Sequence, residues 1–194
     1  MSIKYAILGY LSWRALSGYD LKKLIADSVA FHWTGNNSQI YTTLVELHRA
    51  GMVTQELQPQ EHYPTRKVYT ITDRGVADLR LWLLTTPELP QLRNVFLTQL
   101  AWADCLTAPE LDALLAKYEA EVQMQLLMCR EQERRGSVSP ARTPREAYLW
   151  RMLAENRIGF YEHEVAWAQR VRRELAAGAG EAGGASMPKA GGEE

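Results

Sequence analysis

The feature that most constrains the fold is the segment 36–50, which has the beginning, the periodicity and the end of a single helix. Asn36 and Gln39 have the spacing of a capping box, in which two side chains satisfy free N–H groups at a helix N-terminus. Gly51 can take the left-handed conformation that ends a helix. Three apolar residues recur between the caps at helical spacing and are expected to be buried: Ile40, Leu44 and Leu47.

The opposite face of this helix is short, polar and rich in hydrogen-bonding groups. We expect the following residues to point away from the core: Ser38, Gln39, Thr42, Thr43, Glu46 and Arg49. Side chains of this kind near a helix N-terminus can bond the base edges and phosphates of a duplex. An ordinary surface helix with a solvated polar face fits the same pattern. The segment alone leaves both interpretations open. The sequences before and after it distinguish between them.

Two shorter helices are predicted before this segment. Ile3, Ile7 and Leu11 mark a first helix that ends near Trp13. Ser17 is a candidate N-cap for a second helix, in which leucine and isoleucine residues again recur on one face. Three successive helices with one apolar face each form the core of a helix-turn-helix unit.

After Gly51 the pattern changes to that of β-strands. Residues 52–57 and 67–72 are both rich in β-forming side chains, and the second stretch alternates between two faces. The polar connection 58–66 contains Pro59 and Pro64, and because proline cannot continue a hydrogen-bonded ladder we expect a long tip there. A hairpin placed directly after a helix-turn-helix predicts a wing.

The far part of this hairpin carries the densest group of basic side chains near the central helix, namely His62, Arg66 and Lys67. In a winged helix-turn-helix, cations at this place can contact phosphates or the minor groove. A solvated hairpin arm with incidental cations is the alternative, because charged side chains usually lie in water.

Five motifs along residues 3–84 occur in the same order as in a known family. They are residues 6–11 (AILGYL), 17–21 (SGYDL), 38–44 (SQIYTTL), 51–53 (GMV) and 65–75 (TRKVYTITDRG). With these motifs the chain resembles the PadR-like transcriptional regulators, a winged helix-turn-helix family that includes phenolic-acid-responsive repressors. Glu46 departs from the expected surface, because a carboxylate on the outer face of the central helix repels phosphate unless it accepts a hydrogen bond from a cytosine amino group.

Four more helices are predicted after the hairpin. The first is capped by Thr72 or Asp73 and ends before Pro87, and the second covers about residues 91–104. A capping box at Thr107 and Glu110 opens a long helix. Its apolar residues form a seam: Leu111, Leu115, Tyr118, Val122 and Cys129. A third capping box, with proline at the first helical position, opens the last helix at residue 144, and this helix runs to about Leu175.

The last helix carries two apolar stripes. One consists of Leu149, Leu153, Phe160, Trp167 and Val171, and the other of Ile158, Tyr161, Val165 and Ala168. A helix on a single core needs only one stripe, so a second one indicates a second apolar partner, most economically another copy of the chain. A fully internal helix of one monomer is the alternative. The resemblance also implies a helical dimerisation domain after the wing, with residues 92–97 and the two long helices matching it.

These segments predict a mainly α fold with a small β-hairpin wing. We expect a winged helix-turn-helix DNA-binding domain at 1–86, a helical dimerisation domain at 87–176 and a disordered tail rich in glycine and alanine at 177–194.

Composition narrows the classes of function. The net charge of −1 provides no general basic field, which argues against a non-specific DNA coat but permits a local basic surface. Cys105 and Cys129 lack metal-ligand spacing and are expected to be packed thiols. No apolar run approaches the roughly 18 residues that span a bilayer, so a reducing cytoplasm is the expected location. Scattered histidines, without a nucleophile or phosphate motif, indicate neither an enzyme nor a metal or cofactor site.

The hypothesis that unites these features is a homodimeric transcriptional regulator, expected to be a repressor, that binds a pseudo-palindromic operator in double-stranded DNA. Asn37, Ser38 and Gln39 are assigned to base edges or nearby phosphates, and Gln39 suits adenine. The DNA backbone contacts are assigned to the remaining predicted residues: Tyr41, Thr42, Thr43, His62, Arg66 and Lys67.

The resemblance further implies a small, often aromatic effector that binds near the dimer interface and changes the spacing of the two reading helices. Trp102 and His163 are the residues to test first for such a site. The rival hypothesis is a winged-helix protein-interaction module without direct DNA readout, which the near-neutral charge and Glu46 favour.

Overall fold

The computed structural model describes residues 3–28, 37–60, 63–89, 94–136 and 139–178. Two compact units make up the chain: unit 1 comprises Met1–Gln91 with Glu131–Arg157, and unit 2 comprises Leu92–Arg130 with Ile158–Glu194. The predicted Asn36 cap, His62 and most of the predicted tail lie outside the described residues. The domain boundary expected between residues 86 and 87 stays a prediction.

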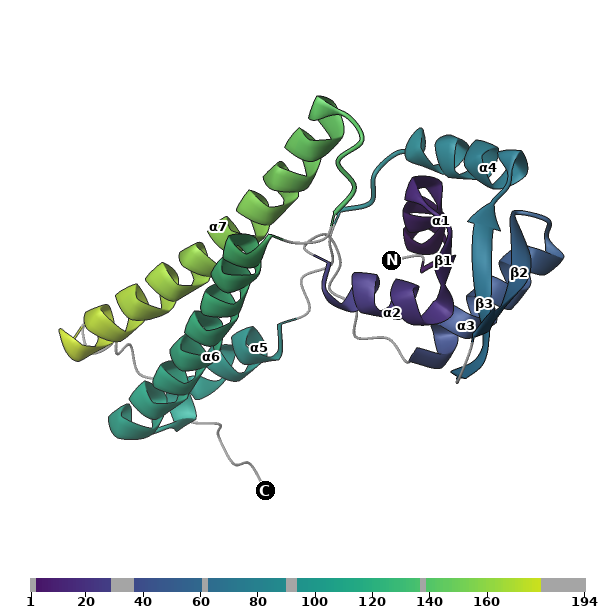
Figure 1. Cartoon of the computed structure of the whole chain (residues 1–194). Coiled ribbons are helices and arrows are strands. Elements are labelled where there is room, and N and C mark those ends of the chain that lie inside the picture. Colours follow the sequence, from purple (N-terminus) through teal and green to yellow (C-terminus); the bar gives the residue numbers. More distant parts are fainter. Residues whose placement is uncertain (1–2, 29–36, 61–62, 90–93, 137–138, 179–194) are drawn as a thin grey trace, which may run out of the picture. The chain divides into compact units, whose positions relative to one another are not determined.

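Four helices and a small sheet form the first part of unit 1 (Figure 1). The helices are α1 (Ile3–Trp13), α2 (Gly18–Ala26), α3 (Asn37–Arg49) and α4 (Asp73–Leu83). The predicted local signals are present: Ser17 caps α2, Thr72 caps α4 by accepting from the Gly75 N–H, and Gly51 follows α3 with a φ of 68°. The predicted order of helices is therefore confirmed in this unit.

The wing is part of a three-stranded antiparallel sheet. β1 (Leu16–Ser17) pairs with β3 (Tyr63–Ile71), which pairs with β2 (Val53–Gln60), so the strand order is β1-β3-β2. The hairpin register runs from Val53 opposite Ile71 to Gln60 opposite Tyr63.

The long hairpin tip predicted for residues 58–66 is wrong, because both strands continue through their prolines. Pro59 lies on the edge strand β2, at the register shift between Gln58 and Gln60. Pro64 lies on β3 beyond the reach of β1, which pairs only with Val68 and Tyr69. Edge positions and irregular pairs are the places where a sheet tolerates a missing N–H donor.

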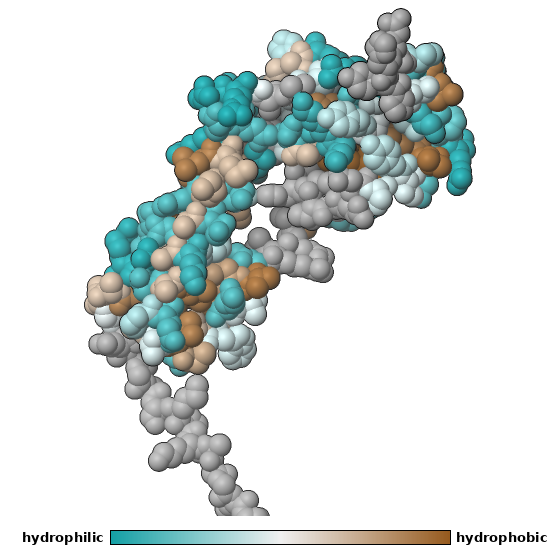
Figure 2. Space-filling model, turned by 60° about the horizontal axis from the view of Figure 1, so that its bottom comes forward, coloured by the Kyte–Doolittle hydropathy of each residue, from teal (hydrophilic) through white to brown (hydrophobic). Residues whose placement is uncertain are grey.

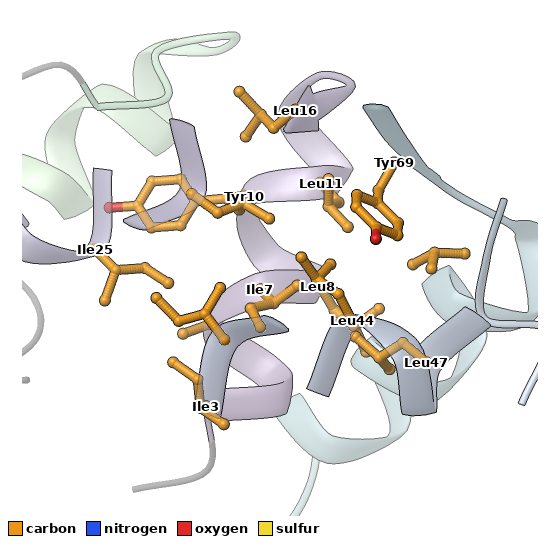
Figure 3. Close-up of a cluster of buried hydrophobic side chains, with 14 of the residues drawn as sticks. Ile3, Ile7, Leu8, Tyr10, Leu11, Leu16, Ile25, Leu44, Leu47 and Tyr69 are labelled. Atoms are coloured by element: carbon orange, nitrogen blue, oxygen red, sulfur yellow. The ribbon is translucent and has the colours of Figure 1, made fainter. Parts of the chain in front are cut away.

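The core of unit 1 is built around α1. Figure 3 shows Ile7, Leu8 and Leu11 of this helix lying among side chains that include Leu44 of α3 and Tyr69 of β3. Ile7, Leu8 and Leu44 are completely buried. Since the buried face of α3 is part of this core, its opposite face is held in a defined orientation.

Helix α4 closes the other side of α1. The rings of Tyr5 and Trp82 are stacked with centroids 4.4 Å apart, and Lys4 pairs with Asp78 at 2.7 Å. A Cβ atom at Gly75 would overlap the carbonyl oxygen of Met52. Glycine at this position therefore allows the start of α4 to approach the turn after α3.

The remaining helices are α5 (Val95–Ala101), the short 3-10 helix η1 (Ala103–Cys105), α6 (Ala108–Arg135) and α7 (Pro144–Ala176). The helix predicted for 91–104 is shorter than expected. Asn94 starts α5 by accepting from the Phe96 N–H at 3.0 Å. At its other end the Trp102 N–H bonds Gln99 O, so the chain tightens into η1 instead of continuing as an α-helix.

Unit 2 contains α6 up to Arg130 and α7 from Ile158, with α5 packed against these two helices. Val122, Leu126 and Cys129 of α6 bury against Tyr161 of α7, which confirms most of the predicted seam. Phe96 of α5 stacks on Tyr118 with centroids 3.7 Å apart, and the Tyr118 hydroxyl donates to Glu164. Polar bonds therefore supplement the apolar contact between the two long helices.

Only one of the two predicted stripes of α7 is well covered. Tyr161 and Ala168 of the second stripe are buried, whereas Leu149, Leu153 and Phe160 of the first are exposed, Phe160 by 50%. On α6, Met124, Leu127 and Met128 are exposed as well. Figure 2 shows such apolar (brown and tan) side chains at the surface of the part that contains α6 and α7.

The two cysteines differ in their exposure. Cys129 is buried as predicted, but Cys105 is exposed, because it lies in the short η1 turn and not on the packed face of a longer helix. Within the described ranges, no helix combines the length and the apolar character that crossing a bilayer requires.

Candidate nucleic-acid interface

The outer face of α3 presents polar side chains from its first turns. Ser38, Gln39, Tyr41 and Thr42 are exposed, and the Thr42 hydroxyl donates to Ser38 O at 3.1 Å. This bond leaves the lone pairs of the Thr42 oxygen available to accept, while the Gln39 amide can both donate and accept. Asn37 begins the helix, and its side chain lies outside the described part of the structure.

Thr43 does not belong to this face, and the prediction that it points away from the core is wrong. Its exposure is only 7%. Thr43 lies three residues after Ile40 and four before Leu47, so it falls within the i, i+3, i+4, i+7 stripe that α3 turns toward the core. Because threonine is polar, the apolar pattern of the sequence did not mark position 43 as part of the buried face. The Thr43 side chain is therefore not available for a contact with DNA.

Tyr41 is held against the start of α2. A Cβ atom at Gly18 would lie only 2.5 Å from Cε1 of the Tyr41 ring. The missing side chain at Gly18 therefore makes the space that the ring occupies, and it lets α2 and α3 approach closely. Tyr41 nevertheless remains about half exposed.

The start of α2 contains a carboxylate with three donors. Asp20 accepts from the Ser17 N–H at 3.0 Å and the Ser17 hydroxyl at 2.9 Å, and Arg66 of β3 donates to the same oxygen. Burial by itself disfavours the ionised form of Asp20, but the two Ser17 bonds and the nearby guanidinium outweigh it and lower the pKa of Asp20. The ion pair links the outer part of β3 in the wing to α2, the helix that precedes α3.

Arg66 is thus paired within the protein, and its contact with the DNA backbone stays a prediction. Asp20 is not among the residues predicted from the sequence, although Ser17 and Asp20 have the spacing of a capping box. Arg66 lies 46 positions further along the chain, so no local signal could have revealed their contact. Lys67, its neighbour on β3, is exposed.

Trp102 and His163 lie on unit 2 and are both exposed, Trp102 by 77%. Trp102 ends α5 and accepts from the Cys105 thiol through its carbonyl oxygen, whereas His163 lies on α7. Among the described residues, no hydrogen bond or ring contact joins the two. The effector site suggested for these two residues stays a prediction.

Two family models match the chain. The Transcriptional regulator PadR-like family matches residues 7–81, and a model named Virulence activator alpha C-term matches residues 92–176. The negative transcriptional regulator PadR of Bacillus subtilis is 33% identical over 109 residues, which are 56% of this chain and 60% of that protein. The chain thus matches less than two thirds of the length of this curated relative.

Solved structures share the fold over most of the chain. Bacillus subtilis PadR in complex with operator DNA has a TM-score of 0.78 at 23% identity and covers 89% of this chain and 98% of its own. The same protein in complex with p-coumaric acid has a TM-score of 0.72 at 23% identity, with coverages of 90% and 98%. The Vibrio cholerae virulence activator AphA has a TM-score of 0.69 at 26% identity, with coverages of 91% and 99%.

These similarities confirm the family that the five sequence motifs indicated. The family and the Bacillus subtilis relative are transcriptional regulators and not enzymes. The mainly helical fold with its small sheet and wing agrees with the solved structures. Over residues 7–81, the chain therefore belongs to the PadR-like family of transcriptional regulators.

Proposed function

We propose that the protein is a sequence-specific DNA-binding regulator, a repressor that acts as a homodimer and is released from its operator by a small aromatic effector. The observation that carries the proposal is the division of α3 into two faces. Ile40, Leu44 and Leu47 are buried, while Ser38, Gln39 and Thr42 are exposed on a helix next to the hairpin that carries Arg66 and Lys67. A helix held in this way can present hydrogen-bonding groups to the major groove in a single orientation.

The roles on DNA follow from the chemistry of each side chain. Asn37, Ser38 and Gln39 are proposed to contact base edges or adjacent phosphates, and Tyr41 and Thr42 the backbone. The wing is proposed to add Lys67, Arg66 and His62 as phosphate contacts. Thr43 is left out, since its side chain is buried. Glu46 lies further along the exposed face, so the contact is proposed to involve mainly the first two turns of α3.

Gln39→Ala tests the reading role directly. Selection of bound fragments from a random DNA pool is expected to give a pseudo-palindromic site for the natural chain. The variant is expected to lose its preference at one base position per half-site, a loss of about 2 kcal/mol in discrimination. Gln99→Ala, an exposed glutamine on α5, is the matched control. An unchanged preference profile in Gln39→Ala would remove Gln39 from the base contacts.

The proposed wing contacts predict how the affinity for DNA depends on salt concentration. Arg66→Ala combined with Lys67→Ala should weaken binding to all sequences and flatten its salt dependence, because released counterions set that slope. Lys67→Ala alone is expected to lower the slope by about one. Arg66→Ala alone should lower it less, because Asp20 already balances part of this charge. The control is Lys117→Ala, an exposed lysine on α6, and an unchanged slope in the double variant would exclude the wing.

Uncovered apolar surface supports the homodimer. The exposed rows are Leu149, Leu153 and Phe160 on α7 and Met124, Leu127 and Met128 on α6. Exposed apolar groups of this size are typical of protein interfaces, and a second copy of the chain would cover them. We propose residues 1–86 as the DNA-binding domain and 87–176 as the dimerisation domain.

The effector part of the proposal is supported by the fold shared with Bacillus subtilis PadR, which has been solved with p-coumaric acid. Titration with phenolic acids, followed by tryptophan fluorescence, tests this ligand class in the natural chain and in Trp102→Phe and His163→Ala.

The rival function, a protein-interaction module, is favoured by the exposed Glu46 and Val45 on α3. A gel shift with the DNA upstream of the chain's own coding sequence separates the two functions.

A further inference from the structure

The C-terminal end of α2 is bound by two side chains from distant helices. The Gln132 side-chain amide, near the end of α6, donates to Asp27 O. Arg157 of α7 donates to Ser28 O at 3.2 Å through Nη1, and to the Gln132 side-chain oxygen through Nη2. All four residues belong to unit 1. Two carbonyl groups and two side chains thus form one connected network.

The chemistry of a helix end explains this network. The last carbonyl groups of a helix have no partner within it and carry partial negative charge. A guanidinium presents several donors in a plane, so it can bond a carbonyl and an amide oxygen together. Ser28 is only 5% exposed, so water has little access to the residue at which Arg157 binds. Hydrogen bonds in such surroundings are stronger than those at an open surface.

The segment 142–157, which comprises Arg142 and the start of α7, makes two more contacts with helices of unit 1. Arg142, just before α7, donates to Ser12 O near the end of α1 at 2.6 Å. The Trp150 ring lies against Tyr10 with centroids 6.3 Å apart, and the Tyr10 hydroxyl donates to Leu24 O of α2. The ends of α1 and α2 are therefore both held by the segment 142–157.

The network matters for α3 because it binds the chain shortly before that helix begins. Ser28 comes after the last turn of α2, and α3 begins at Asn37. Whatever holds the end of α2 also sets the point from which the chain continues to the reading helix. We propose that Arg157 is a positioning residue that, together with Gln132, ties α7 to the helix-turn-helix. Its effect on DNA binding rests on the function proposed above, but its effect on α2 and α3 does not.

Hydrogen exchange on the full chain without DNA tests the structural part. Arg157→Ala is expected to speed exchange about tenfold at the end of α2 and in the second turn of α3, where the N–H groups are first bonded within the helix, because a charged hydrogen bond is lost. Gln132→Ala should act at the same amides more weakly, and Arg157→Lys should restore part of the protection. Arg151→Ala removes a more exposed arginine from the same helix and should change neither segment.

Unchanged exchange at these amides in Arg157→Ala would overturn the inference. Equal acceleration at α1 and α4 would also overturn it, because that pattern signals general loss of stability. If Arg157→Ala does not fold, Gln132→Ala and Arg157→Lys provide the same comparison. In a DNA assay, Arg157→Ala is expected to lower the ratio of specific to non-specific affinity about tenfold. If the natural chain binds no DNA, the proposed function fails while the exchange result still stands or falls separately.

Discussion

Phe160→Asp is expected to turn the proposed homodimer into monomers and to lower operator affinity about a hundredfold, because two linked DNA-binding domains bind far more tightly than one. Phe160 is 50% exposed on the uncovered stripe of α7. A carboxylate at this place would have to be buried without a partner when two copies associate, which opposes association strongly. The side chain has little cover within its own subunit, so the fold of each subunit should persist. Sedimentation and a titration with the selected operator measure the two effects.

Ala166→Asp is the control for this prediction. It adds the same charge to an exposed position of α7 outside both stripes, and dimerisation is expected to be unaffected. A Phe160→Asp chain that remains dimeric would show that this stripe is not the interface. A monomeric chain that still binds the operator with full affinity would instead contradict the cooperation of two DNA-binding domains.

Leu44→Ala is expected to have the largest effect on stability, a loss of about 3 kcal/mol in the free energy of unfolding of unit 1. Leu44 is completely buried between α3 and α1, and the removed methyl groups leave a cavity that the surrounding side chains fill only in part. The outer face of α3 keeps its residues but loses the contact that orients it. Denaturant unfolding followed by circular dichroism measures the change in stability.

Val45→Ala provides the comparison. Val45 is the next residue on the same helix and is 44% exposed, so the loss of a similar apolar group leaves no enclosed cavity. Its cost should stay within about 0.5 kcal/mol. Equal losses in the two variants would contradict the assignment of Leu44 to the core.

Several features of the fold could be predicted because their signals are local. Ser17 and Thr72 start helices by satisfying N–H groups within a few residues, and Gly51 ends one by adopting a positive φ. The two stripes of α7 are likewise visible in the sequence, since they depend only on the 3.6-residue repeat. The outer residues Ser38, Gln39 and Thr42 followed from the same repeat.

Other features depended on neighbours that are far away in the sequence. The strands pass through Pro59 and Pro64 because of where the sheet has its edges, which the hairpin sequence does not contain. Asp20 meets Arg66, and Arg157 meets Ser28, only because the folded chain brings them together. Thr43 is buried because the core covers a wider part of α3 than its apolar residues mark.

The amino-acid sequence by itself determined where α2 and α4 start, where α3 ends, the existence of the wing and the polar character of the α3 surface, because capping and periodicity act over one or two turns. Tertiary structure alone decided which cation is paired, which stripe of α7 is covered and what holds the end of α2. Those outcomes depend on contacts between residues far apart in the sequence, 46 positions for Asp20 and Arg66 and 129 positions for Ser28 and Arg157, and local preferences carry no information about such contacts.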